Sequence, residues 1–331
     1  MGRLPFETAG FSGAGSPPSV GELDVSMPRL FHAAATVGAT PLASEPHRPL
    51  IEMCWRIALV ASSLDDDGAY WNRSDAYDRL DRSEKTAISY FLGMTQAKVT
   101  SEMLFSVSHL VHVDAMLSVL GHPPTNRSRP DLVGFDNDTG SMSLAVEAKG
   151  RSRGWDRKAV DKAKSQATAL PAVLLTSSSL AVASLAFFND RIWCSYLEDP
   201  ETLAGDGNFT VTIELVLVAY YLPIVRAVLT DGVVAAETIA NDRIAVRLPD
   251  LDLILGLPRS ILTILQDLPA SGGVPPDHLT LAGAALRAET ARLHGITRDG
   301  ARGDKPVDLA GESKAHVGAD GISIELGTSW T

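Results

Sequence analysis

The spacing of hydrophobic and polar positions divides the chain into stretches of different predicted structure. Residues 1–48 are rich in Gly, Pro, Ser and Ala and show weak periodicity, which predicts an irregular N-terminal arm. Hydrophobic residues then recur at helical spacing over 48–64, and again from Ser83 to about residue 120, which predicts two helices. Ser83 and Glu84 suit the N-terminus of the second helix, since a Ser side chain can cap free N–H groups and an acid favours the positive end of the helix dipole.

Beyond residue 129 the period shortens to that of β-strands. The runs "DLVGFD" and "MSLAVEAK", separated by "DNDTG", predict a hairpin. Helical spacing returns over 156–170, "AVLLT" is typical of a buried strand, and 180–199 predict a second hairpin that turns at Asn189-Asp190. A long helix, a hairpin, a helix, a strand and a hairpin in this order indicate an α/β core.

The pattern predicts three regions. After the arm at 1–48, residues 49–230 form a helical lead-in and the α/β core. Residues 231–331 form a C-terminal extension of unknown role, with a hairpin in "RIAVRLPDLDLILGL", a helix over 279–295 and a loose polar tail over 296–320.

Composition fits a folded protein. Hydrophobic residues make up 45% of the 331 residues and charged residues 21%. The uncharged stretch 165–189 contains Pro171 and many hydroxyl side chains, so we expect strands there and no membrane span. Cys54 and Cys194 lie far apart without metal-binding spacing, which suits a reducing compartment, and we therefore expect a cytoplasmic protein.

The net charge of −11 argues against a general binder of polyanions, although one segment is strongly basic. The segment from Lys149 to Lys164 contains seven basic residues and two acidic ones. A solvated helix face is the plain reading of such a run. Its position directly after a candidate site instead favours phosphate binding. Trp155 within it offers a ring for base stacking, although a Trp that covers the core is the plainer reading. The predicted phosphate-binding residues are Arg151, Arg153, Arg157, Lys158 and Lys162.

The first hairpin predicts a site. If it is centred on Thr139, Asp131 lies directly opposite Glu147, with Cβ atoms about 4.5–5.5 Å apart. Lys149 points to the same face, because side chains alternate along a strand. The opposite, core-facing side of the strand carries Leu144, Val146 and Ala148.

These three residue types together have a chemical reason. Opposed carboxylates repel one another, and a divalent cation removes that cost. Hard oxygen ligands suit Mg²⁺ or Mn²⁺, which bind one or two carboxylates together with substrate phosphate oxygens. A Lys beside the cation can position a water molecule and neutralise developing charge. The hairpin therefore predicts metal-dependent hydrolysis of phosphodiesters.

Pro130-Asp131 followed by Glu147-Ala148-Lys149 resembles the signature of the PD-(D/E)xK nuclease superfamily, which has the restriction-endonuclease-like fold. The resemblance is closest over about forty residues that end at Gln166, and the order of elements extends it to roughly 84–200. Two further D/E-x-K tripeptides, Asp156-Arg157-Lys158 and Glu312-Ser313-Lys314, do not end an apolar strand.

The resemblance implies an α-β-β-β-α-β core with a mixed central sheet flanked by helices, to which this chain adds N-terminal helical and C-terminal α/β extensions. It implies that the carboxylates of Asp131 and Glu147 and the carbonyl of Ala148 bind the metal, and that Lys149 positions the attacking water. Glu102 on the preceding helix would add an acid and Gln166 on the following helix a polar group.

The function implied is a Mg²⁺-dependent nuclease that cleaves DNA, in genome defence, restriction or repair. Two alternatives stay open: a nuclease-fold subunit that binds or scaffolds without cutting, and an RNA-processing nuclease, because phosphate chemistry is common to both nucleic acids. Assembly also stays open, as a homodimer or as a subunit of a defence complex. Elsewhere, His109 and His112 lie three apart in the predicted helix, where packing is the plainer reading than a zinc site.

Overall fold

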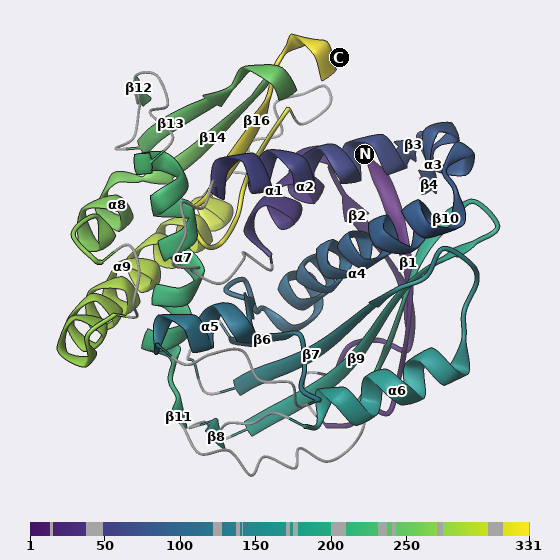
Figure 1. Cartoon of the computed structure of the whole chain (residues 1–331), viewed down its shortest axis with the longest axis horizontal. Helices are drawn as coiled ribbons and strands as arrows, with labels where there is room; N and C mark the ends of the chain where they lie inside the picture. Colours follow the sequence, from purple (N-terminus) through teal and green to yellow (C-terminus); the bar gives the residue numbers. More distant parts are fainter. Residues whose placement is uncertain are drawn as a thin grey trace.

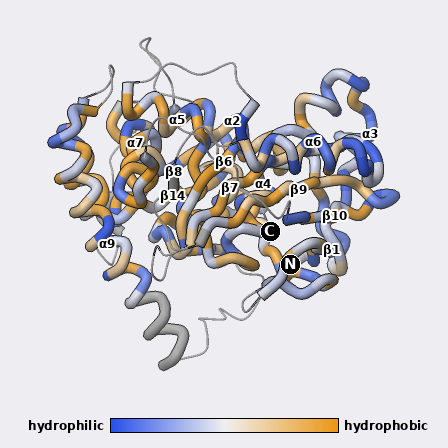
Figure 2. The backbone as a smooth tube through the Cα atoms, turned by 90° about the horizontal axis from the view of Figure 1, so that it is seen from below, coloured by the Kyte–Doolittle hydropathy of each residue, from blue (hydrophilic) through white to orange (hydrophobic). Residues whose placement is uncertain are grey.

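The computed structural model describes residues 1–13, 16–37, 49–121, 128–136, 140, 142–169, 173–174, 178–199, 210–230, 237–239, 243–269, 274–303 and 314–330. These residues form an α/β protein in which helices cover both faces of a mixed central sheet (Figure 1). Hydrophobic residues concentrate on the central strands and on a buried helix of the C-terminal half, α7 (Figure 2).

The central sheet has nine described strands. Its main path runs through β2 (Val20–Val25), β1 (Gly2–Ala9), β10 (Ile192–Glu198), β9 (Ser178–Asn189), β7 (Met142–Gly150), β6 (Leu132–Phe135) and β5 (Val111–His112). The short strands β3 (Leu64–Asp66) and β4 (Trp71–Arg73) pair beside β10. β7 and β9 run parallel, with α6 (Arg157–Ala167) between them in sequence, whereas β5, β6 and β7 form an antiparallel meander. The predicted α/β class with a mixed sheet is therefore confirmed.

The predicted irregular arm over 1–48 is wrong for its described part. β1 and β2 pair as a hairpin that extends the central sheet, and α1 (Met27–Thr36) follows. Leu4, Phe6 and Thr8 are the buried positions of an alternating strand. The Gly and Pro content obscured this alternation, but Pro5 lies before the β10 register begins at Phe6, so its missing N–H costs no bond to β10.

The helix predicted to run to residue 120 is shorter than expected. α4 (Arg82–Phe105) begins with a capping box in which Asp81 and Glu84 bind each other's backbone N–H groups. It ends at Ser106, whose left-handed φ of 56° breaks the helix. The chain then forms β5 and a short helix, α5 (Val113–Val119), so the apolar spacing past Ser106 belongs to a strand and a second helix.

α4 packs against β7 through two glycines. A Cβ at Gly93 would lie 2.7 Å from the Gly150 nitrogen, and a Cβ at Gly150 would overlap the carbonyl oxygen of Ser89. Backbone therefore touches backbone at this crossing, which no larger residue permits. Below it, Met94 and Ala97 of α4 join Leu144, Val146 and Ala148 in one hydrophobic cluster, as the predicted strand face requires.

Replacing Gly150 by alanine is expected to destabilise the protein by about 3 kcal/mol, the upper end of the usual range for overpacking, because α4 must move away from β7. Urea unfolding followed by circular dichroism measures the change. Gly68→Ala is unsuitable as a control because its φ of 84° is itself strained. Gly295→Ala on a helix, where an added Cβ meets nothing within 4 Å, is expected to be neutral or stabilising.

The C-terminal region is built into the rest of the molecule. The remaining helices are α2 (Pro49–Ser63), α3 (Asp75–Arg79), α7 (Ile213–Thr230), α8 (Arg259–Leu265) and α9 (Pro276–Gly303). A second sheet joins β12 (Glu237–Ile239), β13 (Arg243–Leu248), β14 (Leu253–Pro258), β16 (Ser323–Leu326) and β15 (Ala315–Val317), and the short strands β8 (Val173–Leu174) and β11 (Thr210–Val211) pair separately. The predicted hairpin over β13 and β14 is confirmed.

One hydrophobic core extends from Leu4 to Ile324 and so includes all three predicted regions. β15 and β16 contact α1, and α9 packs along α7. The predicted loose tail over 296–320 is wrong at its end, because Asp320 is completely buried; residues 304–313 lie outside the described residues. Among the described helices, none is both long and apolar enough to cross a membrane.

Candidate active site

The first hairpin has the register that the sequence predicts. Leu132 pairs with Val146 and Phe135 with Ser143, which places Asp131 opposite Glu147. β6 begins only at Leu132, so β7 extends beyond its partner strand. Asp131 occupies this position: its Oδ2 accepts a hydrogen bond from the Ala148 N–H at 3.0 Å. The carboxylate is thereby fixed at the open edge of β7.

Glu147 and Lys149 complete the cluster on the same face of β7. The Lys149 ammonium forms an ion pair with Glu147 Oε1. Glu147 is fully buried, and its second oxygen, Oε2, has no hydrogen-bond partner. The Lys149 side chain remains 28% exposed and Asp131 is partly exposed, so the cluster reaches solvent at these two residues. The structure thus brings together the three residues on which the sequence prediction depends.

Both carboxyl groups of the cluster have a raised pKa. Burial, followed by the negative charge of Asp131, raises the pKa of Glu147 to about 7, although Lys149 opposes the shift. Burial also raises the pKa of Asp131, against the positive charges of Lys149 and His112. Two acids in one desolvated place are costly to ionise together, which is the electrostatic condition that a divalent cation relieves.

The raised pKa of Glu147 predicts a pH-dependent effect of metal on stability. Below the pKa of the unfolded state, about 4.3, Glu147 is protonated in both states; as pH rises through 7, the folded state loses stability because it must ionise a buried acid. We expect Mg²⁺ to raise the melting temperature more at pH 8 than at pH 5.5, where protons compete for the carboxylates. Thermal melting with Mg²⁺ and with EDTA at both pH values measures this. An equal Mg²⁺ effect at both pH values would contradict it.

The chemistry of the donors fits Mg²⁺ or Mn²⁺. Two carboxylates meet, and Glu147 Oε2 is a buried oxygen without a partner. Within the described part of the chain, no group of three or more His, Cys, Asp or Glu residues is arranged to hold a metal ion. Mg²⁺ does not need such a group, since it keeps several waters and takes one or two carboxylates plus phosphate oxygens. The ligand role of the Ala148 carbonyl stays a prediction.

His112 and Tyr90 belong to the site and were not predicted. His112 pairs with Leu132 across β5 and β6, next to Asp131, and its Nδ1 accepts the Asp114 N–H at 3.1 Å. In the neutral ring the proton is then on Nε2. Burial, followed by the negative charge of Asp131, raises the pKa of Tyr90 to about 12. His112 was missed because the sequence predicted one helix to about residue 120, and a residue in a helix would not pair with β6.

Glu102 and Gln166 are not part of the cluster. Glu102 lies on α4 twelve residues beyond Tyr90, about 18 Å along the helix axis, and its charge acts on Lys98 instead. Gln166 lies on α6, with its Oε1 buried and unpartnered, and no contact joins it to Asp131 or Glu147 in the described residues. A helix prediction fixes neither rotation nor distance, which is why these two positions could not be assigned.

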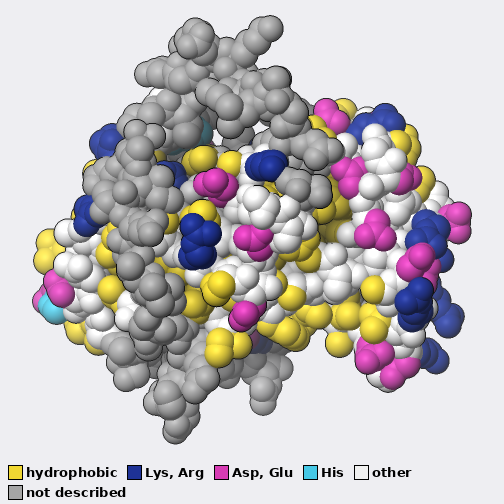
Figure 3. Space-filling model, turned by 90° about the horizontal axis from the view of Figure 1, so that it is seen from above, with side chains coloured by type: hydrophobic (Ala, Val, Ile, Leu, Met, Phe, Trp, Pro, Cys, Tyr) yellow, Lys and Arg dark blue, Asp and Glu magenta, His cyan; other side chains and the backbone are white. Residues whose placement is uncertain are grey.

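The basic run splits into paired and unpaired residues. Arg151 is paired with Asp156 at 2.8 Å, and Arg157 with Asp161 and Glu198. The exposed residues without an ion pair to any described residue are Arg153, Lys158 and Lys162. Elsewhere on the surface, basic and acidic side chains lie side by side, as on the face drawn in Figure 3. Three of the five predicted phosphate-binding residues therefore present unpaired cations, and phosphate binding stays a prediction.

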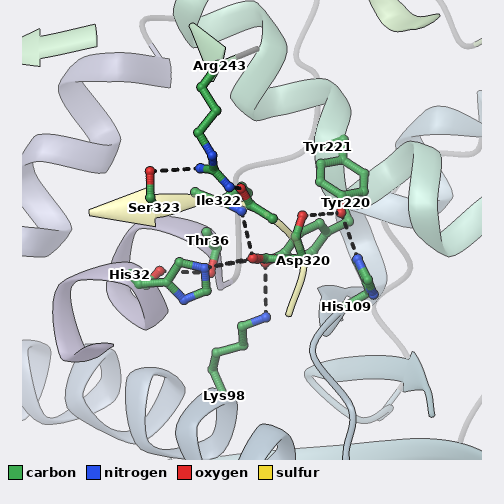
Figure 4. Close-up of polar contacts among 11 residues, drawn as sticks. His32, Thr36, Lys98, His109, Tyr220, Tyr221, Arg243, Asp320, Ile322 and Ser323 are labelled. Carbon is green, nitrogen blue, oxygen red and sulfur yellow. Dashed lines mark hydrogen bonds and ion pairs between the residues drawn. The ribbon is translucent and has the colours of Figure 1, made fainter. Parts of the chain in front are cut away.

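A second polar cluster lies inside the molecule (Figure 4). Asp320 accepts hydrogen bonds from Tyr220 and from the Ile322 N–H, and contacts His32 Nε2 at 3.0 Å. The Lys98 ammonium donates to the Tyr220 hydroxyl at 3.0 Å.

This buried network is enclosed. Burial would raise the pKa of Asp320, but the charge and hydrogen bond of His32 and the charge of Lys98 hold it well below its usual range. Lys98, His32 and Asp320 have no exposed surface, so substrate has no access to them. The network connects α1, α4 and α7 to the C-terminal segment, and we assign it a role in stabilising the fold.

Comparison of the chain with protein-family models, with curated proteins and with solved structures finds no match, so any family assignment depends on the residues and geometry of the site.

Proposed function

We propose that the protein is a Mg²⁺-dependent phosphodiesterase of PD-(D/E)xK type that cleaves DNA. One observation carries the proposal: Asp131, Glu147 and Lys149 meet on one face at the open edge of β7. Two opposed carboxyl groups whose pKa values are raised by burial destabilise the folded protein when they ionise. Metal binding would compensate for this cost and would explain why both acids lie beside a lysine.

The order of elements supports the same assignment. α4, β5, β6, β7, α6 and β9 follow one another as α-β-β-β-α-β, with the short α5 and β8 inserted. β6 starts directly after Asp131, and β7 carries Glu147 and Lys149 before α6 crosses to a parallel β9. A restriction-endonuclease-like core has this arrangement, which agrees with the resemblance of the sequence.

The reaction divides among the chain's own residues. When bound, Mg²⁺ would supply charge stabilisation to the phosphate and lower the pKa of a water molecule. Asp131 and Glu147 would hold the ion, and the hydrogen bond from Ala148 N–H keeps Asp131 in place for it. Lys149 would turn from Glu147 toward the attacking water and neutralise charge that develops on phosphate.

DNA is the proposed substrate, held on the outside of α6. Arg153, Lys158 and Lys162 are exposed and follow Lys149 in sequence, which places unpaired cations close behind the site. Contacts of this kind bind phosphate without reading sequence and weaken as salt rises. Cys54 and Cys194 are not joined in a disulfide, which is compatible with a cytoplasmic role in defence, restriction or repair.

Incubating the purified protein with linear, circular, single-stranded and double-stranded DNA and with RNA tests the proposal. We expect Mg²⁺-dependent cleavage of DNA that EDTA abolishes. Cleavage of RNA alone would reassign the substrate. Tight DNA binding without cleavage in Mg²⁺ or Mn²⁺ would instead identify a binding subunit that keeps the nuclease fold.

A further inference from the structure

Exposed aromatic side chains lie on α2 and α4 near the end of β7, and Tyr90 is close enough to Asp131 for that charge to act on its hydroxyl. Trp55 of α2 is 48% exposed and Tyr90 of α4 is 40% exposed, which is unusual for rings of this size. Both contact Phe91 edge-on, with ring centroids 4.6 Å from Trp55 and 5.1 Å from Tyr90. Phe91 therefore joins the two exposed rings into one surface, the aromatic ledge, made of Trp55, Tyr90 and Phe91.

The ledge adjoins the catalytic strand. α4 lies against the end of β7, where a Cβ on Gly150 would be 3.1 Å from the Tyr90 nitrogen. Gly150 directly follows Lys149, so the Tyr90 ring projects from a backbone position in contact with the strand that carries Glu147 and Lys149. Figure 1 shows α4 passing along β7 with α2 beside it.

The ledge offers rings rather than charge. The nearest cation, Arg56 of α2, is held by Glu52 and by the carbonyl oxygen of Val37. A phosphate-binding surface would present unpaired cations, as the exposed side of α6 does with Lys158 and Lys162. Two surfaces of different chemistry thus lie near one site: a cationic one suited to the backbone of a nucleic acid and an aromatic one suited to its bases.

An aromatic surface can stack only on a base whose face is free. In a duplex both faces of every internal base are covered by neighbouring bases, whereas unpaired bases stack readily on Tyr, Trp and Phe rings. The base belongs to the same nucleotide as the phosphate being cut, so it falls beside the acid pair, where the ledge lies. We propose that the aromatic ledge binds an unpaired base next to the scissile phosphate, and that the protein acts on single strands or frayed ends.

This inference depends on the proposed function. It is tested by the fluorescence anisotropy of a labelled oligothymidylate and of a labelled hairpin duplex, with Ca²⁺ in place of Mg²⁺ to limit cleavage. Trp55→Ala and Tyr90→Leu are each expected to weaken binding of the single strand about 5- to 100-fold and to lower the ratio of single-strand to duplex affinity by a similar factor. Tyr90→Phe keeps the ring and is expected to retain that ratio. Leu281→Ala changes an exposed apolar residue on α9 and serves as the control.

The outcomes separate the inference from the function. If the wild type cleaves DNA but Trp55→Ala and Tyr90→Leu leave the affinity ratio unchanged, the ledge has no role in binding. An equal loss for both substrates, or an equal loss in Tyr90→Phe and Tyr90→Leu, also overturns stacking. A wild type that neither binds nor cleaves any nucleic acid overturns the proposed function and the inference together. Circular dichroism confirms that each variant folds.

Discussion

Replacing Asp320 by alanine is expected to lower the free energy of unfolding by about 3–5 kcal/mol, enough to unfold a marginally stable protein. Asp320 is fully buried and is the acidic partner of His32 and Lys98. Its removal leaves the Lys98 ammonium buried beside the Tyr220 hydroxyl, with only the weaker effect of the Glu102 charge to stabilise it. Urea unfolding at pH 7 measures the loss.

A second substitution distinguishes charge from volume. Lys98→Met in the Asp320→Ala protein removes the uncompensated cation and is expected to recover part of the lost stability. The pH dependence has a definite sign: because the folded-state pKa of Asp320 is depressed, its contribution is present above the unfolded pKa of about 3.9 and declines as pH falls below it. If Asp320→Ala lowers the free energy of unfolding by less than 1 kcal/mol at pH 7, the network does not stabilise the fold as we infer.

Replacing Lys149 by alanine, or Asp131 by asparagine, is expected to reduce Mg²⁺-dependent cleavage about 10³-fold. Lys149 and Asp131 keep exposed surface while Glu147 is buried, and Asp131 is fixed by the Ala148 N–H. Asp131→Asn keeps the shape of the side chain and removes a buried charge, so folding should be preserved and the melting temperature without metal should not fall. Initial rates on plasmid DNA measure the effect.

The chain contains its own control for this experiment. Lys314 ends another D/E-x-K tripeptide and is exposed, so Lys314→Ala tests the tripeptide without the strand context. It should cleave as fast as the wild type. Equal activity of Lys149→Ala and Lys314→Ala would remove Lys149 from the reaction.

The hairpin could be predicted because its two strands are close in sequence and their pairing follows from the residues of that segment alone. Alternation fixed which face of β7 carries Glu147, and the symmetric spacing about Thr139 gave the register that sets Asp131 opposite it. Loss of that register by one residue would move Glu147 into the hydrophobic cluster, which the apolar Val146 and Ala148 positions forbid. The α/β class follows from the same change in periodicity.

What the sequence could not give depends on contacts between distant segments. Gly2–Ala9 becomes a central strand only because β10, almost 190 residues later, pairs with it. His112 reaches the site because Ser106 adopts a left-handed conformation and ends α4 early, and spacing alone gave no sign of that break. Asp320 lies in a polar stretch, and its burial depends on partners from α1, α4 and α7.

Mn²⁺ binding, measured by electron paramagnetic resonance in competition with Mg²⁺, tests the acid pair most directly. The account predicts one site on the wild type at pH 8, displaced by Mg²⁺, and no such site on the Asp131→Asn, Glu147→Gln double variant. Undiminished Mn²⁺ binding by a folded double variant, or none by the wild type, would contradict it.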